Sequence, residues 1–105
     1  MKANDYERIK REKRPFMSKH QKTLEAVFAT PIRAGILWSD IESLLLNKGA
    51  VITEGRGSRV RIALMGVKAV FHRPHPEKET NKGAVRDMRE FLTKAGVLPK
   101  VGDTP

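Results

Sequence analysis

The sequence predicts an α+β fold in which helices pack on one face of a small three-stranded antiparallel sheet. Two patterns lead to this prediction. Residues 58–64 alternate between apolar and basic side chains, as a strand with one buried face does, and residues 81–95 carry apolar side chains at helical spacing. A chain of 105 residues is expected to form one domain with a single modest core and no deep cofactor cavity.

Two of the expected helices lie at the two ends of this domain. The first covers residues 18–29, because Ser18 is a good N-cap residue and Pro31 lies just beyond the end. The last covers residues 81–95 and stops at Gly96.

A further helix is expected to begin near Ser39, in the segment WSDIESLLLNKGA. Ser39 and Glu42 have the spacing of a capping box, in which the two side chains satisfy free backbone N–H groups of the first turn. Gly49 supplies a left-handed residue that ends this helix.

Three short segments between the helices have strand character, namely residues 50–54, 58–64 and 67–72. Met65–Gly66 is a tight-turn signal, so the last two segments are expected to form a hairpin. The register set by this turn directs three pairs inward: Val60 with Phe71, Ile62 with Ala69, and Leu64 with Val67.

The same register defines an outer face of the sheet that is rich in basic side chains. Arg59 is expected to lie opposite His72, and Arg61 opposite Val70, with Lys68 nearby. Both faces of the hairpin are therefore consistent with a sheet that buries one side only.

The charge of the chain points to a polyanionic partner. Lys and Arg number 21 against 12 Asp and Glu, and the formal net charge is +9. Five of these bases and no acid fall between Gly55 and Pro76, so the excess is not confined to a basic terminus. Because cationic side chains gain affinity by releasing the counterions of phosphates, RNA is the expected partner.

Other classes are disfavoured by composition. The sequence has no cysteine, which excludes disulfides and thiolate zinc sites, and no apolar run of membrane-spanning length. The HxxH spacing of His72 and His75 falls in a proline-broken segment without an obvious carboxylate partner, so no metal site and no cofactor is expected. We expect a cytoplasmic protein without membrane attachment.

Several motifs between Trp38 and about Leu98 resemble the HicA toxin family of bacterial toxin–antitoxin systems. They are the helix WSDIESLLLNKGA, the pair Gly57–Ser58, the pair His75–Pro76, and EKETNKGAVRDM with Lys82–Gly83 at the start of the last helix. The resemblance implies a compact α-β-β-β-α core similar to a double-stranded-RNA-binding domain. It also implies a ribonuclease that cleaves mRNA without metal and is neutralised by a HicB-type antitoxin.

With this resemblance, the chain is expected to divide into four parts. These are a flexible basic arm at 1–17, an additional helix and linker at 18–35, a HicA-like RNA-binding domain at 36–98, and a mobile tail at 99–105.

The catalytic position departs from the family pattern. The family's histidine follows the Gly-Ser pair, where this chain has Arg59, and a guanidinium is a poor general base at neutral pH. His72, across the hairpin from Arg59, is the candidate base, with Arg59 and Arg61 binding phosphate. The alternative, that His72 is an ordinary exposed strand histidine, stays open.

Further RNA contacts are expected around this centre. Arg56 lies in the flexible turn Gly55–Gly57, and the backbone at Asn81–Gly83 offers N–H groups to an anion, although Asn81 can equally serve as a simple N-cap. The aromatic residues fall at core spacing, which favours recognition through shape and phosphates over base stacking. The remaining candidate contacts are Lys68, Arg73, His75, Lys78 and Lys82.

Three functions remain open from the sequence: an active HicA-like endoribonuclease, an RNA-binding module of the same fold that has lost cleavage, and a protein that chiefly docks an acidic antitoxin. The preference for double- or single-stranded RNA and the oligomeric state are also left open.

Overall fold

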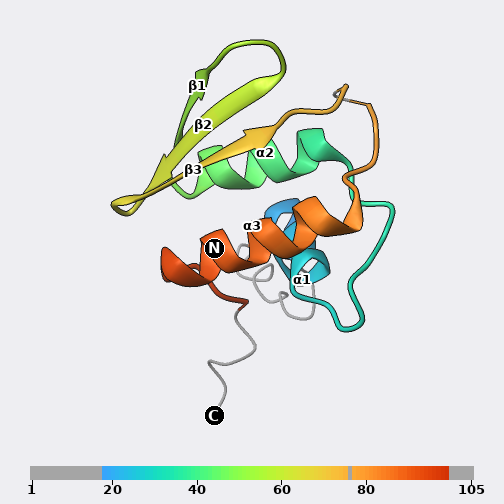
Figure 1. Ribbon diagram of the computed structural model, residues 1–105. Helices are drawn as coiled ribbons and strands as arrows, with labels where there is room; N and C mark the ends of the chain where they lie inside the picture. Colours follow the sequence, from blue (N-terminus) through green and yellow to red (C-terminus); the bar gives the residue numbers. More distant parts are fainter. Residues whose placement is uncertain (1–17, 76, 100–105) are drawn as a thin grey trace, which may run out of the picture.

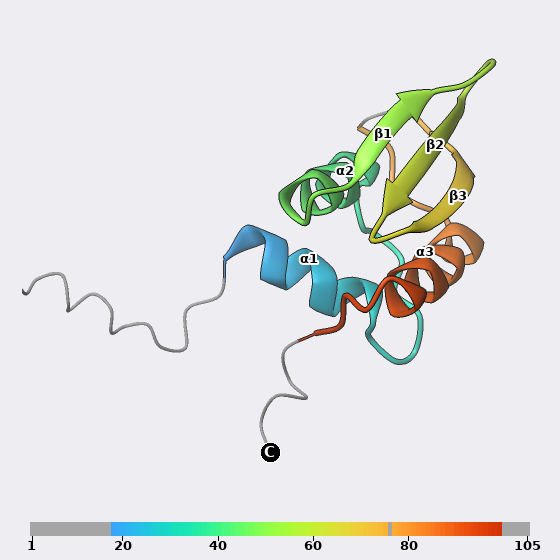
Figure 2. The ribbon, with the colours of Figure 1, turned by 90° about the vertical axis from the view of Figure 1, so that its left-hand side faces the viewer.

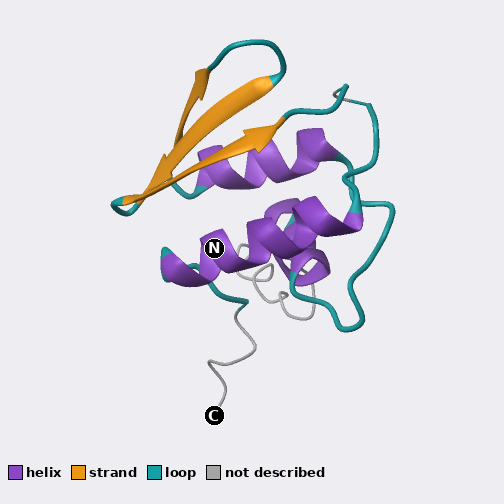
Figure 3. Ribbon diagram, in the orientation of Figure 1, coloured by secondary structure: helices purple, strands orange, loops and turns teal. Residues whose placement is uncertain are grey.

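The computed structural model describes residues 18–75 and 77–99. Within them the elements follow the order α1 (Lys19–Val27), α2 (Trp38–Asn47), β1 (Val51–Glu54), β2 (Arg59–Leu64), β3 (Val67–His72) and α3 (Lys82–Lys94) (Figure 1). The helices gather on one side of the sheet, which confirms the expected α+β class (Figure 3). The expected arm at 1–17 and all but the first residue of the expected tail lie outside the described residues.

The sheet has the strand order β1-β2-β3, and both neighbouring pairs are antiparallel. The predicted register of β2 and β3 is confirmed, because Arg59 pairs with His72 and Leu64 with Val67. Met65 and Gly66 join the two strands with φ angles of 51° and 82°. Positive φ at both central residues is the geometry of a type I′ turn, whose twist matches that of the strands.

The core lies between the inner face of the sheet and the helices. Val60, Ile62 and Leu64 of β2 are almost fully buried there. The Phe71 ring packs between two other aromatic rings, with centroids 6.0 Å from Trp38 and 5.9 Å from Phe91. The α2 and α3 residues that complete this core are Ile41, Leu44, Leu45, Val85, Met88 and Leu92.

The expected capping box at the start of α2 is wrong. The N-cap position is Leu37, two residues before Ser39, and within the described chain no side chain caps this end. Glu42 accepts hydrogen bonds from the Trp38 indole and from Arg73 instead of turning back to the helix start. The Glu42 carboxylate therefore binds a charged and an aromatic donor and does not accept from the backbone N–H groups at the helix start.

The expected caps of the other two helices are confirmed. Ser18 Oγ accepts a hydrogen bond from the Gln21 backbone N–H at 3.1 Å, at the start of α1. Asn81 Oδ1 accepts one from the Ala84 N–H at 2.8 Å, at the start of α3. Each cap satisfies one of the N–H groups that a helix start leaves free.

Helix α1 is fastened to α3 at its C-terminal end. The Arg89 guanidinium donates to the Val27 carbonyl at 3.0 Å and to the Ala29 carbonyl at 2.6 Å. It also lies 5.8 Å from the centre of the Phe28 ring, within the range of a cation–π contact. Because the last carbonyls of a helix have no partner within the helix, a cation at this place is favourable.

We expect Arg89→Ala to lower the free energy of unfolding by about 1–3 kcal/mol, because two carbonyls lose a charged donor. Arg86→Ala, on the exposed side of the same helix, is the matched control and should change it by less than about 0.5 kcal/mol. Urea unfolding followed by circular dichroism measures both. Equal effects of the two substitutions would contradict the fastening of α1 by Arg89.

Candidate nucleic-acid interface

The helices leave the other side of the sheet uncovered, and we call this side the outer face (Figure 2). The outward positions of the strands follow from the pairing register and from the alternating burial of β2. The outer face consists of Val51, Thr53, Arg59, Arg61, Ala63, Lys68, Val70 and His72. It therefore combines four basic or titratable side chains with a small apolar centre.

Arg56, Arg59 and Arg61 line a hollow of about 300 Å³ at one end of the outer face, together with Gly55 and Val70. We call this hollow the arginine pocket. Among the described residues no carboxylate lines it. Guanidinium groups that line one hollow without a carboxylate beside them are suited to bind the oxygens of a phosphate.

The loop between β1 and β2 lines this pocket through Gly55 and Arg56 and is held by two backbone hydrogen bonds. The Gly55 N–H donates to the Arg59 carbonyl at 2.8 Å, and the Arg59 N–H donates to the Arg56 carbonyl at 3.1 Å. A Cβ atom at Gly55 would lie 3.2 Å from the Arg59 carbonyl oxygen, so any other residue would have to shift this backbone by a few tenths of an ångström. The loop thus brings Arg56 from outside the sheet to the two arginines of β2.

His72 lies beside Arg59 on the outer face, at the end of β3. Its Nδ1 is 3.2 Å from Ser58 Oγ, and the Ser58 carbonyl accepts a bond from the Arg73 N–H at 2.6 Å. If Nδ1 carries the proton and donates to Ser58, Nε2 is left as a basic nitrogen. Ser58 is a partner of His72 that our sequence analysis missed, although it immediately precedes the residue that pairs with His72.

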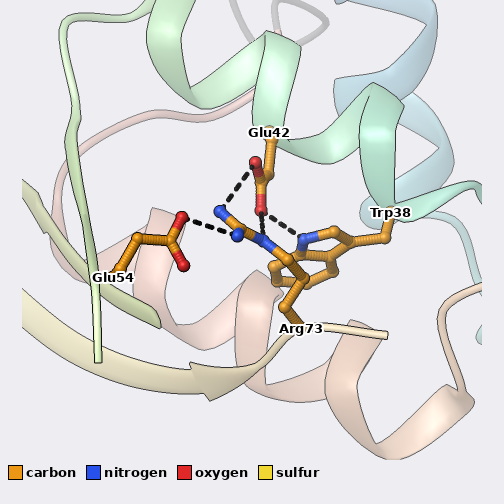
Figure 4. Close-up of polar contacts among 4 residues, drawn as sticks. All are labelled: Trp38, Glu42, Glu54 and Arg73. Atoms are coloured by element: carbon orange, nitrogen blue, oxygen red, sulfur yellow. Dashed lines mark hydrogen bonds and ion pairs between the residues drawn. The ribbon is translucent and has the colours of Figure 1, made fainter. Parts of the chain in front are cut away.

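Arg73 differs in its surroundings from the other candidate RNA contacts. Its Nε donates to Glu42 Oε2 at 2.8 Å and its Nη1 to Glu54 Oε2 at 2.7 Å (Figure 4). The hydrogen bond with Glu42, and next that with Glu54, raise the pKa of Arg73 above its ordinary value. Because carboxylates already occupy its guanidinium, we do not include Arg73 in the phosphate-binding set.

This ion-pair network joins α2 to the ends of β1 and β3. Glu42 lies on α2, Glu54 ends β1, and Arg73 follows β3, while the Trp38 indole donates to Glu42 from the start of α2 (Figure 4). The pairing joins residues 31 positions apart in the sequence, and no local pattern signals it.

The other candidate contacts lie in the segment between β3 and α3. His75 Nδ1 accepts from the Glu77 N–H at 3.3 Å, and the His75 carbonyl accepts from the Lys78 N–H at 2.8 Å, so His75 forms part of a turn. Lys78 and Lys82 are exposed, and Lys82 is the first residue of α3. None of the three lines the arginine pocket, and their contact with RNA stays a prediction.

Two findings concern other kinds of site. In residues 18–75 and 77–99, no group of three His, Cys, Asp or Glu side chains is placed to hold a metal ion. No helix in the same residues is long and apolar enough to cross a membrane.

An α-β-β-β-α core whose described helices leave one basic sheet face open defines a small α+β protein of the double-stranded-RNA-binding-like class. The model of the family described as "HicA toxin of bacterial toxin-antitoxin" matches residues 38–97, and the chain belongs to this family. It is thus a toxin of a toxin–antitoxin system, whose partner is an antitoxin. No curated protein and no solved structure matches the chain. The match begins at the first residue of α2, so α1 is an addition to the family core.

We expect Glu42→Ala to lower the free energy of unfolding by about 1–3 kcal/mol, because it removes the acceptor of the Trp38 N–H and one of the two carboxylates that pair with the half-buried Arg73. Glu54→Ala should cost less than about 1 kcal/mol, since the side chain of Glu54 is 70% exposed against 22% for Glu42. Urea unfolding of both variants measures the difference. A larger loss in Glu54→Ala would contradict the central place of Glu42 in the network.

Proposed function

We propose that this toxin is an endoribonuclease that binds mRNA on its outer face and cleaves it with His72 as general base. The observation that carries the proposal is the pairing of His72 with Arg59 on an exposed surface, with Ser58 at Nδ1 of the imidazole. A hydrogen bond to one ring nitrogen fixes the orientation and tautomer of a histidine, which leaves the other nitrogen to accept a proton.

In the proposed step, His72 Nε2 removes the proton of a ribose 2′-hydroxyl, and the 2′-oxygen attacks the adjacent phosphorus. The bond from phosphorus to the 5′-oxygen breaks, and that oxygen takes a proton from water. The products are a 2′,3′-cyclic phosphate and a 5′-hydroxyl end. Arg59 holds the non-bridging oxygens, where negative charge increases in the transition state.

The antitoxin is proposed to be an acidic protein of the HicB type. The chain carries a net charge of +9, and the outer face presents Arg59, Arg61 and Lys68. A partner with acidic side chains matches this surface in charge, and by covering it would compete with RNA.

One observation favours a second function, which is RNA binding without cleavage. Arg59 stands directly after Gly57–Ser58, where the family's histidine is expected, and arginine does not act as a base at neutral pH. If His72 does not replace that histidine, the same surface binds RNA and leaves it intact.

Cleavage of a labelled mRNA in EDTA separates the two functions. We expect the wild type to cut, and His72→Ala to reduce the rate by about 10²–10⁴-fold through loss of the base. Arg59→Ala should reduce it by about 10²–10³-fold through loss of charge stabilisation. Arg86→Ala is the control, because Arg86 is an exposed residue of α3 that lies outside the outer face, and it should stay within about two-fold of the wild type.

Full activity in His72→Ala would contradict the assignment of the base. Intact mRNA that the wild type nonetheless retards in a gel would establish the second function, and absence of both cleavage and binding would reject RNA as the ligand.

Binding to a 2′-O-methyl RNA, which offers no 2′-hydroxyl nucleophile, tests the arginine pocket without cleavage. The slope of log K against log salt concentration is negative, and Arg56→Ala and Arg61→Ala should each reduce its magnitude by about 0.7–1. The reason is that each variant releases one counterion fewer on binding. Arg86→Ala on α3 is the control and should leave the slope unchanged. Unchanged slopes in both pocket variants would remove the pocket from the RNA contact.

A further inference from the structure

A second hollow on the outer face lies next to the arginine pocket. This second hollow, which we call the apolar groove, has a volume of about 330 Å³ and shares Arg61 and Val70 with the pocket. Thr53 and Lys68 lie at its sides. Because Arg61 and Val70 line both hollows, the two are neighbours, and a ligand with two groups can place one in each.

The floor of the groove is apolar in the middle of a basic surface. Val51 and Val70 are 63% and 59% exposed, which is high for valines in a sheet, and Ala63 pairs with Val51, while Val70 pairs with Arg61. Among the described residues no Asp or Glu lines either hollow. The face therefore suits a ligand with an anionic group beside an apolar, flat one.

A nucleotide has these two parts, a phosphate and a base. In an A-form duplex the bases are stacked and paired inside the helix, so they cannot lie flat on a protein surface. An unpaired base can be turned out, and its apolar face can then cover the valines. The groove, at about 330 Å³, and the pocket, at about 300 Å³, each have a volume at the lower end of the range of ligand sites.

We infer that the outer face binds an unpaired nucleotide of single-stranded RNA, with a phosphate in the arginine pocket and the adjacent base on the apolar groove. The inference rests on the proposed function and names its substrate class. Thr53, Arg61 and Lys68 stand beside the floor as hydrogen-bonding groups for the edge of the base. The sequence had favoured recognition by shape and phosphates alone, because the aromatic residues fall at core spacing. The groove offers aliphatic side chains to the base instead.

Fluorescence anisotropy with three uncleavable 2′-O-methyl probes of equal length tests this inference. The probes are a single strand, the same strand annealed to its complement, and a strand with abasic sites at its centre. We expect the single strand to bind on the order of ten-fold more tightly than the abasic strand, through burial of the exposed valines. The duplex should bind no better than the abasic strand.

The double variant Val51→Ser/Val70→Ser should bind the single strand as weakly as the abasic strand and should bind the abasic strand as the wild type does. Leu46→Ser removes a comparably exposed apolar side chain from α2 and is the matched control, with no change expected. Val70→Thr, which keeps the branched shape preferred in strands, replaces the double variant if the latter does not fold.

Each other outcome overturns the inference in a distinguishable way. Equal affinity for all three probes means that the face contacts phosphates only, and the proposed function stands. No affinity for any probe rejects the proposed function as well. Self-association of the wild type in sedimentation, abolished in the double variant while RNA binding is unchanged, assigns the groove to a second copy of the chain.

Discussion

Strand β2 has two faces, and the helices of this small protein cover only one of them. Val60, Ile62 and Leu64 are drawn inward by the gain from burying apolar surface, and the alternation of a strand then leaves Arg59, Arg61 and Ala63 outside. A shift of the register by one residue would bury two arginines without partners. The burial of three apolar side chains therefore also determines which charged groups can meet RNA.

The Arg73 network is a second constraint, and it lies at the end of the sheet where β1 and β3 both end. Arg73 follows His72 directly, and its side chain and backbone bonds tie that point of the chain to Glu42, Glu54 and Ser58. The loop with Arg56 is enclosed between Glu54 and Ser58, so both of its ends are attached to the same arginine. A long-range ion pair thus contributes to the placement of the pocket without binding phosphate itself.

The strands, the hairpin register and the caps at Ser18 and Asn81 could be predicted from the sequence, because alternation and capping act over a few residues. The capping box of Glu42 was wrong because its carboxylate accepts instead from the Trp38 indole, one turn earlier on the same helix, and from Arg73, which only the tertiary fold brings near. Because the contact with Glu42 spans 31 residues, Arg73 looked like a free cation in the sequence. The apolar groove could not be foreseen either, since it joins side chains of all three strands.

Nuclear magnetic resonance of the ¹⁵N-labelled full chain, titrated with an uncleavable 2′-O-methyl single strand, tests most directly whether RNA binds the outer face. We expect the largest shifts at Arg59, Arg61 and Val70, and in the imidazole signals of His72. The exposed side of α3, with Arg86, should show none. Shifts concentrated on α1 or α3, with the outer-face signals unchanged at saturation, would contradict the account.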